Sequence, residues 1–330
     1  MKKYIILSSF FIVLFTACST KEVYTPKLLG DDWNKLEAYD QEILDTSSNV
    51  ALLEDNKIIT KTGIIDYDLN ASYRLISQSD GWIISSSIDG DLILTAQDDQ
   101  KKREIFKLKK TIASASVHGD DLAVLFADNE MAIYDIQSKA VLFKEQGSKY
   151  LAADSRIVNP YFLRDLVLFA TLDGKVVIVN KKQKKKLRTV IASSEDAFNN
   201  ILSLNVIENK IIAATTYKIL SMSKKEVRAK YEVRNIAYDE KNVYVATKQG
   251  EVLSLNPSLE VNFKVKFPFA HFYGMISNGD KLYVLEKEGY IIVLDKDSFA
   301  YSVHEVDFDD GFIFTSEKIF YANKKKILTE

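Results

Sequence analysis

A unit of two apolar strands joined by a tight polar turn recurs along this chain, and it constrains the fold more than any other feature. The clearest copies are Leu122–Asp135, Leu166–Asn180 and Val243–Asn256. Each has the apolar run of a strand, a short polar interruption, and a second apolar run, which is the signature of a β-hairpin. Eight such hairpins follow residue 48, and their first strands begin at Ile58, Trp82, Leu122, Leu166, Ile211, Val243, Leu282 and Phe312.

The spacing of the hairpins matches the blades of a β-propeller. Consecutive first strands lie 24 to 45 residues apart, about 36 on average, and a propeller blade repeats every ~40 residues. Segments rich in small residues, such as 112–117 and 202–206, precede the hairpins and suit the crowded innermost strand. Charged, amphipathic segments such as 139–146 and 261–267 follow and suit an outer strand with one solvated face. The sequence therefore predicts an all-β fold, a propeller of four-stranded antiparallel blades.

The number of blades follows from the shortest interval. Only 24 residues separate Ile58 from Trp82, so eight blades are favoured if the first is abbreviated, and seven are the alternative. The final segment, 312–330, supplies at most three strands, and we expect ring closure to borrow a strand from the region 49–55. These limits place the propeller at 49–330. A β-sandwich would not need the same strand order eight times.

Glycine is scarce, at 12 residues, and marks the turns. A tight hairpin turn needs residues with positive φ, which glycine adopts without strain. Asn129 and Glu130 occupy the place of glycine in one hairpin, and Tyr217 and Lys218 do so in another. The glycines at or near hairpin turns are Gly63, Gly90, Gly174, Gly250 and Gly289.

The N-terminus has the layout of a secretory signal. Lys2 and Lys3 precede an apolar run, 4–15, which is shorter than the ~20 residues of a membrane-spanning helix. The run ends in the residues LFTAC at 14–18, which resemble the lipobox of bacterial lipoproteins. In that family the cysteine becomes the first residue and carries the lipid, palmitate included. The resemblance implies a signal peptide over 1–17 and lipidation at Cys18; an ordinary cleaved signal or an uncleaved anchor is the alternative.

The segment that follows, 18–48, is predicted to be a lipid-anchored tether. It holds a possible short helix over 31–43, where Trp33, Leu36 and Ile43 nearly keep helical spacing. Ser19 stands where lipoproteins retained at the inner membrane commonly have Asp. The lipoprotein resemblance therefore implies localisation at the outer membrane, facing the periplasm.

Two hairpins, 166–180 and 243–256, resemble the PQQ-type propeller repeat. The tryptophan that ends each repeat in that family is absent, and the aromatic residues Phe106, Phe143, Phe263 and Tyr301 stand in four repeats. A lipoprotein signal followed by such a propeller is similar to the BamB family of outer-membrane lipoproteins, a non-enzymatic branch. The resemblance implies a scaffold that contacts the periplasmic domains of a barrel-forming subunit during outer-membrane protein assembly.

Composition argues against several other functions. The single cysteine excludes a disulfide framework and a multi-cysteine metal site. The three histidines, His118, His271 and His304, lie in different repeats and show no zinc spacing. A net charge of −2 argues against a nucleic-acid binder. We expect no enzyme activity and no cofactor, and a quinoprotein-type enzyme is the less favoured hypothesis.

Two segments are the candidate partner contacts. Pro160, Tyr161 and Phe162 lie in one of the two longest intervals between hairpins, where a loop on a rigid rim would be accessible. Phe269 and Phe272 lie in the most aromatic stretch, for which packing between blades is favoured and an exposed peptide-binding ledge is the alternative. The alternative function is an adhesion or binding lipoprotein whose propeller captures a peptide or another ligand. The basic run 181–188 is expected to be a solvated turn, with contact to anionic lipid or an acidic partner as its alternative.

Overall fold

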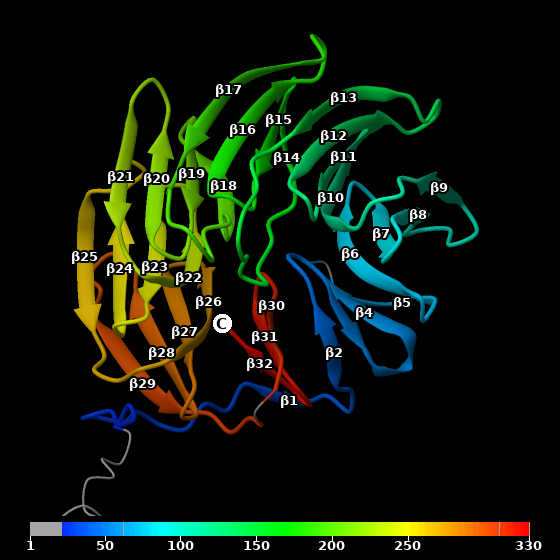
Figure 1. Ribbon diagram of the computed structural model, residues 1–330. Helices are drawn as coiled ribbons and strands as arrows, with labels where there is room; N and C mark the ends of the chain where they lie inside the picture. The colour runs from blue at the N-terminus through cyan, green and yellow to red at the C-terminus, as the bar shows by residue number, and fades with distance from the viewer. Residues whose placement is uncertain (1–21, 62, 310, 330) are drawn as a thin grey trace, which may run out of the picture.

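The computed structural model describes residues 22–61, 63–309 and 311–329, which form eight four-stranded antiparallel sheets around a common axis (Figure 1). The only helical element among these residues is a 3-10 turn at Glu54–Asn56. No helix in this part of the chain is long and apolar enough to cross a membrane. The all-β propeller and the favoured count of eight blades are confirmed.

Blades I to IV follow one another along the first half of the chain, each with its innermost strand first. They are β2 (Ile43–Thr46), β3 (Ala51–Leu53), β4 (Lys57–Thr60) and β5 (Gly63–Asp66); β6 (Tyr73–Ser79), β7 (Trp82–Ser87), β8 (Asp91–Ala96) and β9 (Arg103–Lys107); β10 (Ile112–His118), β11 (Asp121–Phe126), β12 (Glu130–Asp135) and β13 (Val141–Gln146); and β14 (Tyr161–Leu163), β15 (Leu166–Ala170), β16 (Lys175–Asn180) and β17 (Lys185–Ile191).

Blades V to VIII complete the ring, and the last of them takes its outer strand from the start of the chain. They are β18 (Ser203–Ile207), β19 (Lys210–Ala214), β20 (Lys218–Met222) and β21 (Glu226–Lys230); β22 (Val233–Tyr238), β23 (Val243–Thr247), β24 (Glu251–Leu255) and β25 (Val261–Lys266); β26 (Phe272–Asn278), β27 (Lys281–Glu286), β28 (Tyr290–Asp295) and β29 (Tyr301–Glu305); and β30 (Ile313–Thr315), β31 (Ile319–Ala322), β32 (Lys325–Leu328) and β1 (Leu36–Ala38).

The hydrophobic core is a series of layers between neighbouring blades. Side chains of a middle strand alternate between its two faces, and both faces are covered by another blade. Ala123 and Leu125 of β11, for example, pack with Val167 and Phe169 of β15, and all four are buried. The small-residue segments form innermost strands, such as β10 and β18, and the amphipathic segments form outer strands, such as β13 and β25.

Ring closure uses a strand that the sequence did not predict. The strand β1 pairs antiparallel with β32, with Leu36 opposite Ile327 and Ala38 opposite Lys325. The predicted closing region, 49–55, instead contains β3, the second strand of blade I. The error has a physical cause: adjacent strands of a blade have similar apolar patterns, so a hairpin does not reveal its place within the blade.

This ambiguity also explains the short intervals at both ends of the repeat. The hairpin at Ile58 forms strands three and four of blade I, whereas the hairpin at Phe312 forms strands one and two of blade VIII. The other hairpins form strands two and three. The possible helix at 31–43 is also wrong. Leu36 and Ile43 contribute to different interblade layers, and the spacing that imitated a helix comes from two separate strands.

Residues 22–35, which we call the N-terminal strap, are docked on blades VII and VIII. The buried ring of Tyr24 contacts the rings of Phe267 and Tyr290 edge-on, with centroids 6.0 and 5.7 Å apart. The Gly30 amide donates to the Val303 carbonyl at 2.8 Å. From residue 22 onward the chain therefore belongs to the folded body, and the predicted boundary between a tether and a propeller at residue 49 is wrong.

Trp33 anchors the strap beside the closing strand. Its indole packs against Tyr283 and His304, its Nε1–H donates to the Leu328 carbonyl at 3.1 Å, and its amide donates to the Glu305 carbonyl at 2.8 Å. A single side chain thus joins the strap to blade VII and to β32. Substitution of Trp33 therefore tests how much the strap contributes to closure of the ring.

We expect Trp33→Ala to lower the free energy of unfolding by about 3–5 kcal/mol, since it removes a buried aromatic side chain. Trp33→Phe keeps most of the packing and removes the indole hydrogen bond, so it should cost about 1 kcal/mol. Urea unfolding followed by circular dichroism measures both. Equal midpoints for wild type and Trp33→Ala would show that the strap adds nothing to closure.

Candidate functional site

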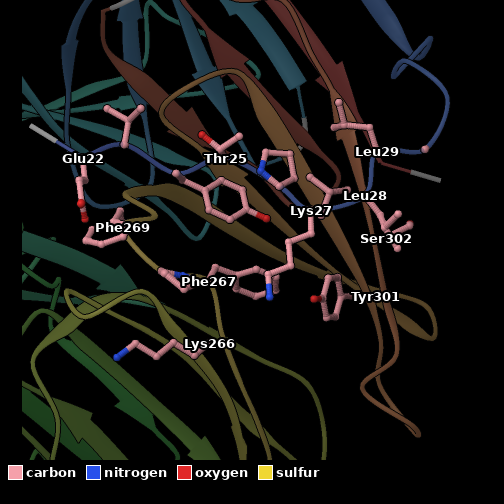
Figure 2. Close-up of a pocket in the computed structure, with 16 residues that line it drawn as sticks. Glu22, Thr25, Lys27, Leu28, Leu29, Lys266, Phe267, Phe269, Tyr301 and Ser302 are labelled. Carbon is pink, nitrogen blue, oxygen red and sulfur yellow. The ribbon is translucent and has the colours of Figure 1, made fainter. Parts of the chain in front are cut away.

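The N-terminal strap lies over a cleft at the outer edge of blades VI and VII (Figure 2). The cleft has a volume of about 1130 Å³ and is lined by residues 22–30 of the strap, the loop 266–269 and residues 301–303 of β29. Phe267 is buried, and the ring of Tyr301 meets it edge-on with centroids 5.0 Å apart. Figure 2 shows Lys27 extending toward these two rings.

The rim of this cleft exposes apolar side chains, which we call the rim patch. Leu28 is 85% exposed and Phe269 is 60% exposed, and the other members are about half exposed. Lys27 and Lys266 add ammonium groups to the same lining. The members of the rim patch are Val23, Leu28, Leu29, Phe269 and Tyr301.

The position of Phe269 is fixed by a close backbone approach. Gly250, at the β23–β24 turn, has φ +76°, and a Cβ atom there would lie 2.2 Å from the Phe267 carbonyl oxygen. The Phe267 amide donates to the Gly250 carbonyl at 2.7 Å. The loop then turns through Phe269, whose φ is 65°. Glycine at 250 therefore lets the loop bury Phe267 and present Phe269 to solvent.

A second cavity, of about 690 Å³, lies at the axis of the ring. Residues of several innermost strands line it, among them Gln78, Ser116, Asn205 and Tyr238. Residues 158–161 complete the wall, just before and at the start of β14. Most of the lining residues are polar and neutral, and Lys61 is the one charged residue among the described lining, so the cavity offers mainly hydrogen bonds to a molecule inside it.

The segment 147–160, which we call the axial segment, crosses toward blades other than its own. The Asn159 Nδ2 donates to Asn49 Oδ1 at 3.3 Å, and the Arg156 Nη1 donates to the Arg234 carbonyl at 2.6 Å. The Asn200 Nδ2 donates to the Arg156 carbonyl at 2.9 Å. Because these partners lie in or beside blades I, V and VI, the axial segment joins opposite parts of the ring.

Charge near the axial segment is paired locally. Arg156 holds the carboxylate of Asp154 through Nε and Nη2, at 2.9 and 2.7 Å. Burial alone would raise the pKa of Asp154, but the hydrogen bonds and charge of Arg156 outweigh it and lower that pKa. Burial and the nearby Arg156 lower the pKa of Arg234. At this end of the axis, Arg156 and Arg234 therefore form a pair of neighbouring cations, and the carboxylate of Asp154 compensates part of their charge.

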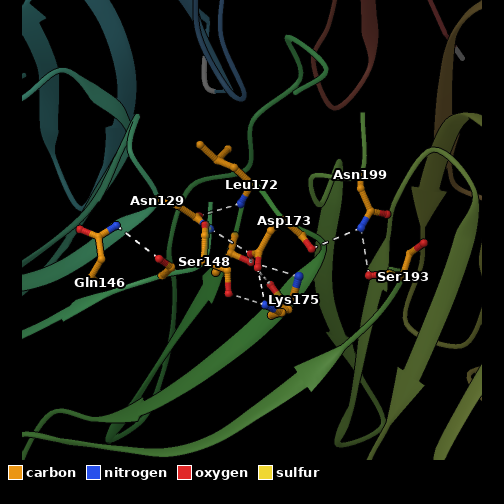
Figure 3. A network of polar contacts seen from close by, with 10 residues as sticks. Asn129, Gln146, Ser148, Leu172, Asp173, Lys175, Ser193 and Asn199 are labelled. Carbon is orange, nitrogen blue, oxygen red and sulfur yellow. Dashed lines mark hydrogen bonds and ion pairs between the residues drawn. The ribbon is translucent and has the colours of Figure 1, made fainter. Parts of the chain in front are cut away.

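A buried polar network ties blade III to blade IV and to the start of the axial segment (Figure 3). Its centre is Asn129, which is fully buried and has φ 68°, as the turn requires. Its Nδ2 donates to the Ser148 carbonyl at 2.8 Å and to Asp173 Oδ1 at 2.9 Å, and its Oδ1 accepts from the Leu172 amide at 3.0 Å. Asn129 does replace a turn glycine, and its side chain adds an interblade bridge.

The candidate contact residues lie in two separate places. Tyr161 is half-buried in the wall of the axial cavity, and Phe162, also half-buried, lies 5.5 Å from the His118 ring. Phe272 is buried, as packing between blades predicts, and Pro160 is buried in the wall of the axial cavity, so contact of these residues with a partner stays a prediction. Phe272 lies on the innermost strand β26, where both faces are covered by neighbouring blades.

The remaining predictions fall as follows. Phe269 is exposed on the rim patch, and Cys18 lies outside the described residues. The basic run 181–188 is an exposed turn that continues into β17, and Lys182, Lys186 and Arg188 form ion pairs with Asp165, Glu145 and Glu226. Within the described ranges, no group of three or more His, Cys, Asp or Glu side chains is placed to hold a metal ion.

Sequence reasoning missed the strap and the axial segment. The sequence predicts a tether over 18–48, whereas Tyr24 and Trp33 are large aromatic side chains of the kind that docks a segment on a folded body. The sequence predicts an accessible rim loop at 160–162, because the length of the axial segment is visible in the sequence but its direction is not.

The chain is similar in sequence to two curated proteins. It is 35% identical over 244 residues to the plasminogen-binding protein PgbB of Helicobacter pylori strain J99, and 34% identical to PgbB of strain 26695. The match covers 71% of this chain and 45% of each relative, so the chain spans about half the length of these curated relatives. No protein-family model matches the chain.

Solved structures share the fold at low sequence identity. BamB from Moraxella catarrhalis superposes with a TM-score of 0.64 at 12% identity, covering 92% of this chain and 98% of that one. The computationally designed Ika8 protein gives 0.64 at 14%, covering 91% and 99%, and the C-terminal WD40 domain of Sif2 gives 0.64 at 12%, covering 92% and 100%. At these identities the likeness concerns the propeller fold alone.

We expect Asn129→Gly to lower the free energy of unfolding by about 1–3 kcal/mol, because Asp173 and the Leu172 amide each lose a buried partner. Glycine keeps the positive φ, so the loss reports the side chain. Asn323→Gly is the matched control: Asn323 has φ 50° in the equivalent turn of blade VIII and is half-buried. Denaturant unfolding compares the two, and equal small losses would contradict the bridging role.

Asp173 makes this network sensitive to acid. Burial acts to raise the pKa of Asp173, but hydrogen bonds from Lys175, Thr171 and Asn129 outweigh it and lower the pKa below its ordinary value. A lowered folded-state pKa contributes stability that is present above pH ~4 and is lost as the pH falls through the folded-state pKa. We expect Asp173→Asn to be less stable than wild type at pH 7, with the difference shrinking below pH ~4. Unfolding midpoints across this range test it, and a constant difference would contradict the assignment.

Proposed function

We propose that this protein is a non-catalytic, lipid-anchored, protein-binding propeller of the bacterial cell envelope. The observation that carries the proposal is the 35% identity, over 71% of the chain, to a protein named for the protein that it binds. The lipobox-like residues around Cys18 supply the anchor, and Ser19 favours the outer membrane, facing the periplasm. The propeller supplies a rigid body on which contact surfaces are preformed, which lowers the entropic cost of association.

The outer strands offer a second kind of contact. Among the described strands, each outermost strand of blades II to VII has one edge without a neighbour in its sheet. An extended segment of a partner adds to such an edge by β-addition. Exposed apolar residues also recur on successive outer strands. They are Ile105, Val141, Leu187, Ile191, Val227, Val261 and Tyr301.

The specific role that we favour is a scaffold in outer-membrane β-barrel assembly. The support is the joint presence of a lipoprotein-type signal and an eight-bladed propeller that superposes on BamB. Barrel precursors and the periplasmic domains of a barrel-forming subunit present extended strands, which suit the open edges of the outer strands. The partners would then be assembly proteins.

The second candidate is binding of plasminogen, as the name of PgbB describes for that protein. It is favoured by the same sequence match, and it corresponds to the adhesion alternative. The two candidates differ in the side of the membrane on which the partner is found. They are therefore separable by capture and by direct binding.

For the assembly role, we expect affinity capture of the lipidated protein after mild crosslinking in cells to recover barrel-assembly subunits. Leu187→Glu on β17 should reduce that recovery severalfold, because it places a charge on an apolar outer strand. Ser72→Glu, in the exposed turn just before the innermost strand β6, adds the same charge outside the outer strands and should leave recovery unchanged. Absence of every assembly subunit from the wild-type capture would exclude this role.

For the plasminogen candidate, surface plasmon resonance with purified plasminogen over the immobilised protein is the direct test. Saturable binding that survives at physiological salt supports it. A flat response, alongside an immobilised PgbB that does bind, would exclude it. Binding in neither experiment would leave the protein-binding proposal itself without support and overturn it.

A further inference from the structure

The rim patch lies close to the predicted site of lipid attachment. Three residues lie between Cys18 and Glu22, the first described residue and part of the cleft lining, so the two are four residue steps apart. A fully extended chain spans at most about 3.6 Å per residue, so this connection reaches no more than ~14 Å. A lipid on Cys18 therefore holds the cleft within roughly that distance of the membrane surface.

The strap fixes which side of the protein faces that surface. Tyr24 is buried against Phe267 and Tyr290, and the Gly30 amide is bonded to the Val303 carbonyl. Because the strap is held at these points, it does not act as a free linker after residue 22. The short connection then limits rotation of the propeller relative to the lipid, and the rim patch is the surface nearest to it.

The chemistry of the rim patch suits a lipid headgroup boundary. Leu28, Leu29 and Phe269 are exposed apolar groups, and Tyr301 adds an aromatic ring with a polar tip, a combination found at membrane interfaces. Lys27 and Lys266 line the same cleft, and lysine side chains keep their charge in the headgroup layer while their stems lie along apolar surface. Among the described residues of the lining, Glu22 is the one acidic side chain.

We propose that the rim patch rests on the leaflet that holds the Cys18 lipid, with Leu28 and Phe269 inserted at the headgroup boundary. This inference depends on the anchor in the proposed function. The occupant of the patch is the lipid surface, bound through a covalent anchor and an adjacent amphipathic contact, and two such signals together give more stable membrane association than one. The propeller would be held in one orientation rather than suspended on a flexible tether.

A tryptophan reporter tests the orientation. Leu28→Trp, in the full lipidated protein in phosphatidylethanolamine–phosphatidylglycerol vesicles, is compared in vesicles with and without brominated acyl chains. We expect the brominated lipid to lower the added fluorescence about twofold, since bromine quenches only indoles at the membrane boundary. Leu28 is 85% exposed, so the substitution should not disturb folding. Wild-type protein gives the background from Trp33 and Trp82.

Val141→Trp is the matched control. Val141 is an exposed apolar residue, 54% accessible, on the outer strand of blade III, across the ring from blade VII (Figure 1). It should show no quenching. Equal quenching at both sites, or none at Leu28→Trp, would overturn the proposal. A blue-shifted but unquenched signal at Leu28→Trp would also overturn it, because another protein surface or the chain's own acyl group would then cover the patch.

The mass of the purified protein separates failure of the anchor from failure of the contact. If Cys18 carries no lipid, the anchor in the proposed function is wrong. The contact is then tested by coupling the thiol of Cys18, the single cysteine of the chain, to maleimide-bearing lipids in the same vesicles. Quenching at Leu28→Trp in that arrangement supports the patch as a lipid-facing surface, and its absence rejects it.

Discussion

The pairing of β1 with β32 is the contact on which the rest of the ring depends. Every blade buries its middle strands against the next blade, so an open ring would leave one face of blade I and one face of blade VIII in water. Three residues, Leu36–Ala38, complete blade VIII and join the two ends of the chain. A ladder of three residues is weak alone. The contacts of Trp33 with Tyr283 and with the Leu328 carbonyl stabilise it, because they hold the chain just before β1 against blades VII and VIII.

Polar contacts between blades complement the apolar layers. Outer strands are linked by ion pairs such as Arg188 of β17 with Glu226 of β21, which are exposed and individually weak. The Asn129 network is different, because its groups are buried and an unpaired partner there would be costly. It also holds the axial segment at Ser148. The segment that crosses the ring is therefore attached to an interblade bridge at its start and, through Asn159, to Asn49 near its end.

The fold was largely predictable from the sequence, whereas the candidate surfaces were predictable only in part. Alternating apolar runs reveal strands because the side-chain period of a strand is two, and the repeated order of small, apolar and amphipathic strands reveals a blade. The pattern carries no information on which blade a terminal strand completes, so β1 was missed. Phe269 and Phe272 show the limit most clearly: three residues apart in one aromatic stretch, one is exposed and the other is buried. Phe269 lies in the loop that passes close to Gly250, whereas Phe272 begins the innermost strand β26, and no local pattern records this difference.

Closure and orientation are served by the same residues. The strap that carries β1 into blade VIII also carries the connection to Cys18, so a lipid at that position would be attached to the part of the molecule that locks the ring. A pull on the anchor would then act on Tyr24 and Trp33 before it reached any blade. Hydrogen bonds of Gly30 and Trp33 to blades VII and VIII would share such a force with the packed rings. A flexible tether would let the propeller rotate freely relative to a lipid on Cys18. The docked strap instead fixes the place on the propeller from which the connection to that lipid starts.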